Sequence, residues 1–295
     1  MPELPEVEVV RRTLAPRMVG DRVARIEARA PALREPLDAA ALAGDLEGRR
    51  IEAVRRRAKY LLFDVKGGRT LALHLGMSGR LTLAEAGGAA DELAEGAADG
   101  AAGGAAAEAA PGKHEHLVIH LASGRRLRFV DPRRFGLAFS LPTAAIGADP
   151  HFAHLGVEPL SDAFDGALLK AAARGRRGPV KPFLMDAKVV VGVGNIYASE
   201  ALFAAGVHPR RSVARIAPAR WRRLAAAVRE TLERAIVQGG SSISDFVDGE
   251  GRAGYFQVTF AVYDREGLPC PRCATPVRRL VQAGRSTFYC PGCQT

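Results

Sequence analysis

The 295-residue sequence contains no run of 18 consecutive apolar residues, so it predicts no transmembrane helix. It also lacks the apolar segment of a secretory signal behind its first residues, and we therefore expect a cytoplasmic protein with no membrane partner. Cysteine is scarce, at four residues. In a reducing compartment, so few cysteines are more typical of a metal site than of disulfides. The length is sufficient for about two domains, each with its own core.

Acidic residues are also few relative to basic ones, because the formal net charge is +10. Residues 84–112 hold six of the 32 acids and no base, which leaves 42 basic against 26 acidic residues elsewhere, or +16. A chain this basic suggests a polyanionic partner, most simply nucleic acid. A merely soluble basic protein is the alternative at this point, since net charge alone says little about a partner.

Of the 29 residues in the acidic stretch 84–112, 21 are Ala or Gly. Repeated glycine breaks helices, and the stretch offers no apolar face that could dock on a core. We interpret it as a mobile acidic loop between two strands. We predict that residues 86–110 can be deleted with little loss of fold.

Secondary-structure patterns divide the chain into three parts. Short alternating segments, from "RIEARA" to "GLAFSL", predict an antiparallel β sandwich or barrel over residues 1–150, preceded by a helix from Pro5. Four helical segments follow in residues 157–260, from "DAFDGALLKAAARG" to "PARWRRLAAAVRETLERAIVQGG". Residues 261–295 form the third part. The fold class is therefore α+β, with an N-terminal β domain and a C-terminal helical domain.

The cysteines form two Cys-x-x-Cys pairs separated by 16 residues, which fits one tetrahedral zinc site. The residues are Cys270, Cys273, Cys290 and Cys293. Because all four ligands are cysteine, no open position remains and the one zinc ion is structural. Paired redox motifs are the alternative, but "RRLVQAGRSTFY" between the pairs has the pattern of a finger hairpin.

The motifs "PELPEVE", "RRAKYLL", "HLGMSG", "DPRRFG" and "GVGNIYASE" precede the cysteines in that order. Together the set resembles formamidopyrimidine-DNA glycosylase, a bacterial base-excision repair family that removes oxidised purines such as 8-oxoguanine, from Pro2 to Cys293. The resemblance implies an N-terminal β sandwich, a helical domain with a helix–two-turns–helix module, and a zinc-finger β-hairpin. It further implies a monomer that acts on double-stranded DNA with an oxidised purine or an abasic site.

The resemblance assigns the chemistry to four residues. Removal of Met1 would expose the secondary amine of Pro2, and an α-amino group titrates near pH 8, so a useful fraction is a free nucleophile. Glu3 would act as general acid and base. Lys59, on an expected strand, would contact the phosphate of the lesion or assist proton transfer, although a lone lysine is usually only a surface residue. Arg285 would act at the phosphate and in elimination.

DNA handling is assigned to seven further residues. Met77, Arg133 and Phe135 match a trio that fills the gap left by the flipped nucleotide, with Arg133 pairing with the orphaned cytosine. On their own, Met77 and Phe135 would be ordinary core residues. The phosphate-contacting positions are His74, His114, Arg177 and Asn195, and "RGRRGP" permits a shifted alignment of Arg177.

A loop corresponding to residues 241–256 would cover the flipped base, and Ser244 stands where some family members carry a basic residue. Two rival functions remain open from the sequence. One is an endonuclease VIII-like enzyme for oxidised pyrimidines, and the other is a non-catalytic zinc-finger protein that binds damaged DNA. The presence of Pro2, Glu3 and Lys59 favours an enzyme.

Overall fold

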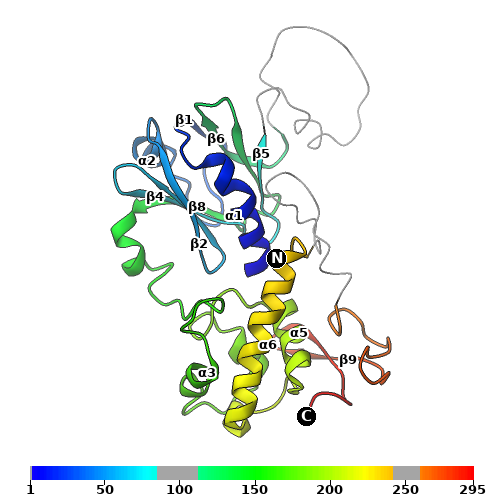
Figure 1. Ribbon diagram of the computed structural model, residues 1–295. Helices are drawn as coiled ribbons and strands as arrows, with labels where there is room; N and C mark the ends of the chain where they lie inside the picture. Colours follow the sequence, from blue (N-terminus) through cyan, green and yellow to red (C-terminus); the bar gives the residue numbers. More distant parts are fainter. Residues whose placement is uncertain (1, 85–111, 242–259) are drawn as a thin grey trace, which may run out of the picture. The chain divides into compact units, whose positions relative to one another are not determined.

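The computed structural model describes residues 2–84, 112–241 and 260–295, drawn in colour in Figure 1. Among the described residues the chain divides into two compact units. We call them the β unit (Pro2 and residues 6–147) and the helical unit (residues 3–5, 148–241 and 260–295). Most of the predicted insertion at 84–112 and most of the base-capping segment 241–256 lie outside the described residues. The predicted three-domain boundaries stay a prediction.

The first helix, α1, spans Leu4–Met18. It begins one residue before Pro5, the predicted first position, so the proline occupies the second helical position, where its missing N–H also removes no intrahelical bond. The predicted apolar stripe is confirmed, because Val7, Val10 and Leu14 are fully buried. Buried Glu8 on the same helix is not left as a bare charge, since Arg56 of the β unit approaches its carboxylate to 3.1 Å.

The β unit contains two four-stranded antiparallel sheets, one in the order β1-β6-β7-β5 and the other in the order β2-β3-β4-β8 (Figure 1). The strands are β1 Val23–Ala28, β2 Ile51–Arg57, β3 Tyr60–Val65, β4 Arg69–His74, β5 Arg80–Ala84, β6 Glu115–Leu121, β7 Arg126–Val130 and β8 Leu137–Pro142. Every strand expected from the sequence is present. The predicted β sandwich is confirmed, because one apolar core unites residues of both sheets with α1.

One helix of the β unit was not expected from the sequence. The helix α2 spans Ala39–Leu46 and begins at Asp38, whose side chain accepts a hydrogen bond from Ala41 N at 2.9 Å. Its segment "AAALAGDL" offers only Leu42 and Leu46 to the core, and both are buried. Two apolar residues at one helical repeat are too weak a pattern to predict a helix.

The helical unit contains α3 Gly166–Ala172, α4 Val180–Leu184, α5 Asn195–Ala205 and α6 Pro218–Val237, with a short 3-10 turn at Val213–Arg215. Another 3-10 turn, Thr143–Ala148, lies at the end of the β unit. The long helix α6 buries the side predicted from its four-residue spacing, including Trp221, Leu224 and Leu232. Helix α5 is buried almost along its whole length and therefore forms the centre of this unit.

The C-terminal hairpin pairs β9 Arg278–Gln282 with β10 Arg285–Tyr289. Its two-residue turn has positive φ at both Ala283 and Gly284, as the twist of a tight hairpin requires. A small core that includes Phe203 of α5 and Phe288 of β10 packs the hairpin against the helix. The predicted finger hairpin is confirmed. Among the described residues, no helix has the length and apolarity needed to cross a bilayer.

Candidate active site and nucleic-acid interface

Glu3 lies at the N-terminal end of helix α5, 190 residues away in the chain. Its carboxylate accepts hydrogen bonds from Gly194 N at 2.8 Å, Ile196 N at 3.0 Å and Tyr197 N at 3.4 Å. These N–H groups have no partner inside the helix, and they carry the positive end of its dipole. Since residue 194 is a glycine without a capping side chain, Glu3 supplies the cap from a distant part of the chain. Glu3 is 2% exposed, so its position is fixed.

Two glycines of "GVGN" make room for this arrangement. A Cβ at Gly194 would lie 2.3 Å from Cδ of Glu3, and a Cβ at Gly192 would lie 2.5 Å from Cβ of Leu4. The space beside these glycines is filled by residues 3 and 4, so the motif receives the N-terminal segment.

Lys181 is a buried lysine that the sequence analysis did not select. Its Nζ donates to Oδ1 of Asn195 at 2.7 Å, to Oγ1 of Thr287 at 2.8 Å and to the Ser286 carbonyl at 3.3 Å. These acceptors match the three hydrogens of an ammonium group. Burial lowers the pKa of Lys181 to about 8, while the nearby Glu3 opposes this shift and Arg285 adds to it. Lys181 therefore ties the start of α5 to strand β10.

Its sequence signal is a single charge in the apolar stretch "PVKPFLM". A charged side chain in such a window is expected to be paired. The signal could have marked Lys181 as unusual, but its partner Thr287 is 106 residues away and no sequence pattern names it.

Asn195 opens α5, as predicted, and its side chain is bound on both sides. Besides accepting from Lys181, it donates from Nδ2 to the Ser286 carbonyl at 3.0 Å. Arg285 begins strand β10 and is exposed, and it directly precedes Ser286, whose carbonyl accepts from both Lys181 and Asn195. The structure therefore brings Glu3, Asn195 and Arg285 together around Lys181. We call these four residues the α5 cluster.

Lys59 is not on a strand, and this expectation was wrong. It lies with Ala58 in the two-residue turn between β2 and β3, where Arg57 pairs with Tyr60. Ala58 takes the positive φ of 54° that such a turn demands, although no glycine marks the turn in "RRAKYLL". Lys59 is half-buried at this hairpin tip, and Pro2 is buried just ahead of α1.

Met77 and Phe135 lie on exposed loops rather than in the core, with 37% and 44% of their surface exposed. The guanidinium of Arg133 lies 4.9 Å from the centre of the Phe135 ring. The core alternative for Met77 and Phe135 is therefore wrong. His74 ends strand β4, and its Nδ1 accepts from Gly76 N at 2.9 Å, which places the proton of a neutral ring on Nε2. His114 is exposed in the turn before β6.

Arg177 and its neighbour Arg176 differ in their surroundings. Arg176 donates to Asp186 at 2.9 Å and lies over the Phe183 ring at 5.5 Å. Arg177 is exposed, and its carbonyl accepts from Ser212 Oγ at 2.8 Å. Arg177 remains the better choice for a phosphate contact, since Arg176 already has an acidic partner.

The four cysteine sulfurs lie within 4.8 Å of one another. Three measured separations are 3.8 Å for Cys270–Cys293, and 3.4 Å from Cys273 to both Cys290 and Cys293. Tetrahedral ligands at about 2.3 Å from zinc would be roughly 3.8 Å apart, so the residues fit one zinc ion. The Thr275 hydroxyl lowers the pKa of Cys273 to about 6, which favours the ligating thiolate.

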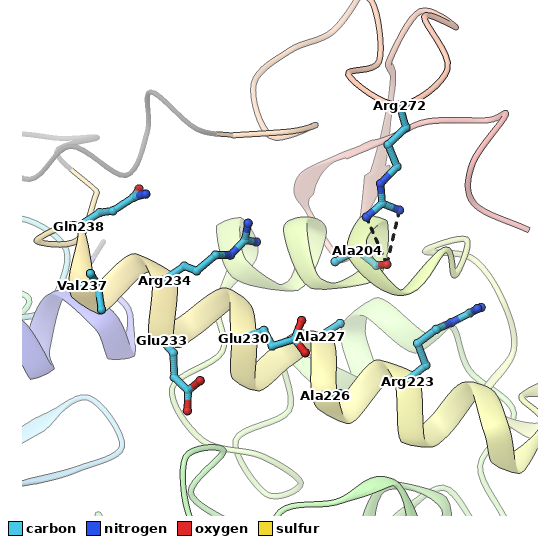
Figure 2. A pocket seen from close by; sticks show the side chains of 10 residues that line it. All are labelled: Ala204, Arg223, Ala226, Ala227, Glu230, Glu233, Arg234, Val237, Gln238 and Arg272. Atoms are coloured by element: carbon cyan, nitrogen blue, oxygen red, sulfur yellow. Dashed lines mark hydrogen bonds between the residues drawn. The ribbon is translucent and has the colours of Figure 1, made fainter.

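A groove of about 580 Å³ lies beside α6 and is lined by none of the predicted site residues. Figure 2 shows the side chains that line it. Its lining includes Arg223, Glu230, Arg234 and, from the first cysteine pair, Arg272. Arg272 donates to the Phe203 carbonyl at 3.1 Å and covers the Phe203 ring at 4.4 Å. The arginine thus closes the C-terminal end of α5 and fastens the finger to it, which is a structural role.

Comparison with known proteins agrees with this arrangement over the whole chain. Residues 1–138 match the formamidopyrimidine-DNA glycosylase N-terminal domain, 155–247 its helix–two-turns–helix (H2TH) domain, and 267–295 the zinc finger found in this family and in isoleucyl-tRNA synthetase. A formamidopyrimidine-DNA glycosylase from Alkalilimnicola ehrlichii is 50% identical over 100% of both chains.

Solved structures give the same picture. The crystal structure of the Fpg protein of Thermus thermophilus is 40% identical, with a TM-score of 0.83 over 99% of this chain and 98% of that one. A Lactococcus lactis Fpg variant bound to DNA containing Fapy-dG is 32% identical, with a TM-score of 0.84 over 100% of both chains. The Lactococcus protein has also been solved with abasic-site DNA and with DNA containing an oxidised pyrimidine.

Proposed function

The chain belongs to the formamidopyrimidine-DNA glycosylase family of base-excision repair enzymes, and we propose that the amine of Pro2 is its nucleophile. The substrate is double-stranded DNA with an oxidised purine, and cleavage of the strand at the resulting abasic site follows. The observation that carries the residue assignment is the position of Glu3. Covalently bonded to Pro2, it is buried and oriented by three backbone N–H groups of α5.

In the first half of the reaction, the nitrogen of Pro2 attacks the sugar C1′ and the glycosidic bond breaks. The electron pair of that bond leaves with the base, which takes up a proton. Glu3 is the proton donor, either to the base or at the ring oxygen of the sugar. The attacking nitrogen loses its proton, and the C1′–O4′ bond then breaks with O4′ taking up a proton, which opens the sugar ring. Because proline is a secondary amine, the product is an iminium with no proton left on nitrogen to lose.

In the second half, the iminium acts as an electron sink. Loss of the C2′ proton expels the 3′ phosphate, and a further proton loss at C4′ expels the 5′ phosphate. Arg285 and Lys59 stabilise the phosphate charge during these steps, and Lys59 also assists proton transfer. Arg285→Ala is therefore expected to weaken DNA binding and to shift the products from δ- towards β-elimination. Water finally hydrolyses the iminium and restores the amine.

DNA binding uses residues of both units. We assign Met77 and Phe135 to filling the gap left by the flipped nucleotide, and Arg133 to pairing with the orphaned cytosine. Their exposure on loop tips supports this role. Phosphate contacts are assigned to His74, His114, Arg177 and Asn195. The zinc ion held by the four cysteines supports the finger hairpin and takes no part in catalysis.

Trapping with borohydride tests the nucleophile, because reduction of the iminium leaves a permanent covalent link between protein and DNA. The protein starting at Pro2 should be trapped on duplex DNA with 8-oxoguanine opposite cytosine and on an abasic duplex. The matched control carries one uncleaved residue before Pro2, which converts the amine into an amide and leaves every side chain unchanged. That control should neither excise the base nor be trapped, and Pro2→Gly should be severely impaired. Full activity of the blocked protein would rule out the proline mechanism.

The same assay addresses the rival pyrimidine activity, which the Lactococcus complex with an oxidised pyrimidine makes a specific alternative. A third duplex with 5-hydroxyuracil is therefore included. We expect excision of 8-oxoguanine to be faster. A reversed order would assign the chain to pyrimidine repair. We also propose that the protein works in the cytoplasm as a monomer, which sedimentation with and without DNA would check.

A further inference from the structure

Two loops of the β unit cross between its sheets at the same end. Residues 75–79 lead from β4 to β5, and residues 131–136 lead from β7 to β8. Since β4 pairs with β8 and β5 pairs with β7, each loop starts in one sheet and ends in the other beside its counterpart. One loop carries Met77 and the other carries Arg133 and Phe135. We call them the Met77 loop and the Arg133 loop.

The backbones of the two loops are in direct contact. A Cβ at Gly76 would lie 2.4 Å from the carbonyl carbon of Phe135 and 2.5 Å from Gly136 N, and the φ of Gly76 is +63°. Any side chain at residue 76 would therefore push the loops apart. Met77, Arg133 and Phe135, the three side chains assigned to the gap in the DNA, therefore project from one pair of contacting loops and not from two independent loops.

Asp131 holds this crossing together. Its side chain is completely buried, and Oδ1 accepts from Ser78 Oγ of the Met77 loop at 2.7 Å. Oδ2 accepts from Gly136 N at 2.8 Å, and Oδ1 lies 3.3 Å from Arg133 N within the Arg133 loop. One carboxylate therefore binds both loops, and its backbone partners stand directly beside Phe135 and at Arg133 itself.

The main chain of Asp131 is fixed as firmly as its side chain. Its carbonyl accepts from Arg134 N at 3.1 Å, which closes a turn through Pro132, and from Nε2 of buried His116 at 2.9 Å. Its N–H donates to the His114 carbonyl at 3.0 Å. The carboxylate consequently cannot follow the loops if they move, and it acts as a fixed point for both.

We propose that Asp131 is a positioning residue for recognition of the base opposite the lesion. By holding Arg133 and Phe135 in register with Met77, it sets the geometry in which the Arg133 guanidinium distinguishes cytosine from other bases. The inference rests on the proposed function, which assigns these three side chains to the gap in the DNA. Asp131 is completely buried and acts through these side chains.

Asp131→Asn tests this role, because an amide of the same size places an N–H₂ group against a donor such as Gly136 N–H. Ser78→Ala is a milder variant that removes only the tie to the Met77 loop. Asp64→Asn is the matched control. Asp64 accepts from Thr70 Oγ1 at 2.7 Å and from Arg55 at 2.8 Å, on strand β3.

Single-turnover excision of 8-oxoguanine is measured opposite cytosine and opposite adenine. We expect the cytosine preference to fall by about tenfold or more in Asp131→Asn, since a well-placed arginine–base contact contributes discrimination of that order. Ser78→Ala should lose a smaller part of the preference, and Asp64→Asn should keep all of it. Cleavage of an abasic site in single-stranded DNA needs no opposite base and should be unchanged in all three variants.

An unchanged cytosine preference in both Asp131→Asn and Ser78→Ala would overturn the inference. So would an equal loss of every activity, including the single-stranded reaction, since that points to general destabilisation. If Asp131→Asn does not fold, Ser78→Ala decides alone. If the parent protein excises no lesion, the proposed function fails first, and equilibrium binding to an abasic-analogue duplex with cytosine or adenine opposite still measures the preference in each variant.

Discussion

Glu3 in the helical unit and Asp131 in the β unit are both buried carboxylates that accept hydrogen bonds from backbone N–H groups, yet they serve different ends. The backbone N–H groups that bind Glu3 lie at the start of one helix, between Gly194 and Tyr197. The partners of Asp131 come from two loops. A carboxylate bound to one rigid helix is itself held still, whereas one bound to two loops holds the loops still. The first arrangement suits a residue that has to stay at one place in a site, and the second suits a positioning residue.

The largest effect is expected for Glu3→Gln, which retains size and an acceptor but cannot donate a carboxylic proton. Excision of 8-oxoguanine should fall by about 10²–10⁴-fold, the usual contribution of a positioned general acid. Cleavage of a preformed abasic site should survive, because no base remains to be expelled. Single-turnover kinetics on both substrates measures this separation.

Glu3→Gln also changes the hydrogen bonds to the backbone N–H groups of α5, so a control with a comparable structural loss is needed. A second buried glutamate, on helix α5, provides it. Buried Glu200 accepts from the backbone N–H groups of Ala261 at 2.9 Å, Val262 at 3.0 Å and Tyr263 at 2.8 Å. Glu200→Gln should lower the melting temperature about as much as Glu3→Gln but retain excision. If Glu3→Gln lost both substrate activities equally, the carboxylate would act through structure or elimination, and its contrast with Asp131 would disappear.

A moderate effect is expected when the zinc site is removed. The finger hairpin is then no longer held in place, whereas Glu3 and Asp131 keep their hydrogen-bond partners. Cys290→Ser should release the metal and weaken binding to duplex DNA by about tenfold or more, since Arg285 is no longer held in place. Metal analysis and binding titrations measure both quantities. Hydrogen exchange of the β unit should be unchanged, and a DNA-competent protein without zinc would contradict the expectation.

The sequence predicted the segments that contain the strands of the β unit because alternating apolar residues mark them, and it predicted the cysteine site because spacing alone defines it. It placed Lys59 on a strand because "RRAKYLL" contains no glycine, whereas Ala58 adopts the left-handed turn conformation regardless. A turn held by the pairing of its two strands needs no local signal of its own.

The sequence could not predict the polar contacts between residues that lie far apart in the chain. Lys181 finds its three acceptors on α5 and β10, and Asp131 finds Ser78 53 residues away. The motif "DPRRFG" is typical of a turn that exposes an arginine, and the aspartate before Pro132 looks like an ordinary turn residue. Only the folded structure shows that Asp131 also holds the Met77 loop, through Ser78.

A smaller effect concerns Lys181, the positive counterpart of the two carboxylates. Its pKa of about 8 in the folded protein lies below the value of 10.5 for a free lysine. Below pH 8 both states are protonated and the fold carries the full cost of burying the charge, about 3 kcal/mol as an upper figure. Between pH 8 and 10.5 the unfolded state binds more protons, so this cost is relieved as the pH rises.

The measurement is the melting temperature of the wild type minus that of Lys181→Met, taken from pH 7 to pH 9.5. This difference should rise with pH. Lys170→Met, at an exposed position on α3, is the control and should show no such trend. A flat or falling difference for Lys181→Met would mean that the ammonium is stabilised by its three acceptors as well as it is by water.

The smallest effect is expected when the acidic segment 86–110 of the β unit is replaced. Strands β5 and β6 both pair antiparallel with β7, so they run parallel to each other and their connection must return along the sheet. Ala84 stands opposite Arg126, whereas Glu115 stands opposite Val130, at the other end of β7. At roughly 3.4 Å per residue along a strand and about 4.8 Å between strands, the path is on the order of 17 Å. Residues 85 and 111–114 alone would span at most about 21 Å, so a bare deletion would leave them almost fully extended. This distance changes the expectation from the sequence that residues 86–110 can simply be deleted.

A linker of about eight Gly and Ser residues in place of 86–110 should leave excision and melting temperature within error of the parent, while a bare deletion should lower the melting temperature through strain alone. Loss of excision in a linker variant that melts normally would show that the six acids act on DNA, and the segment would then join the functional parts of the β unit.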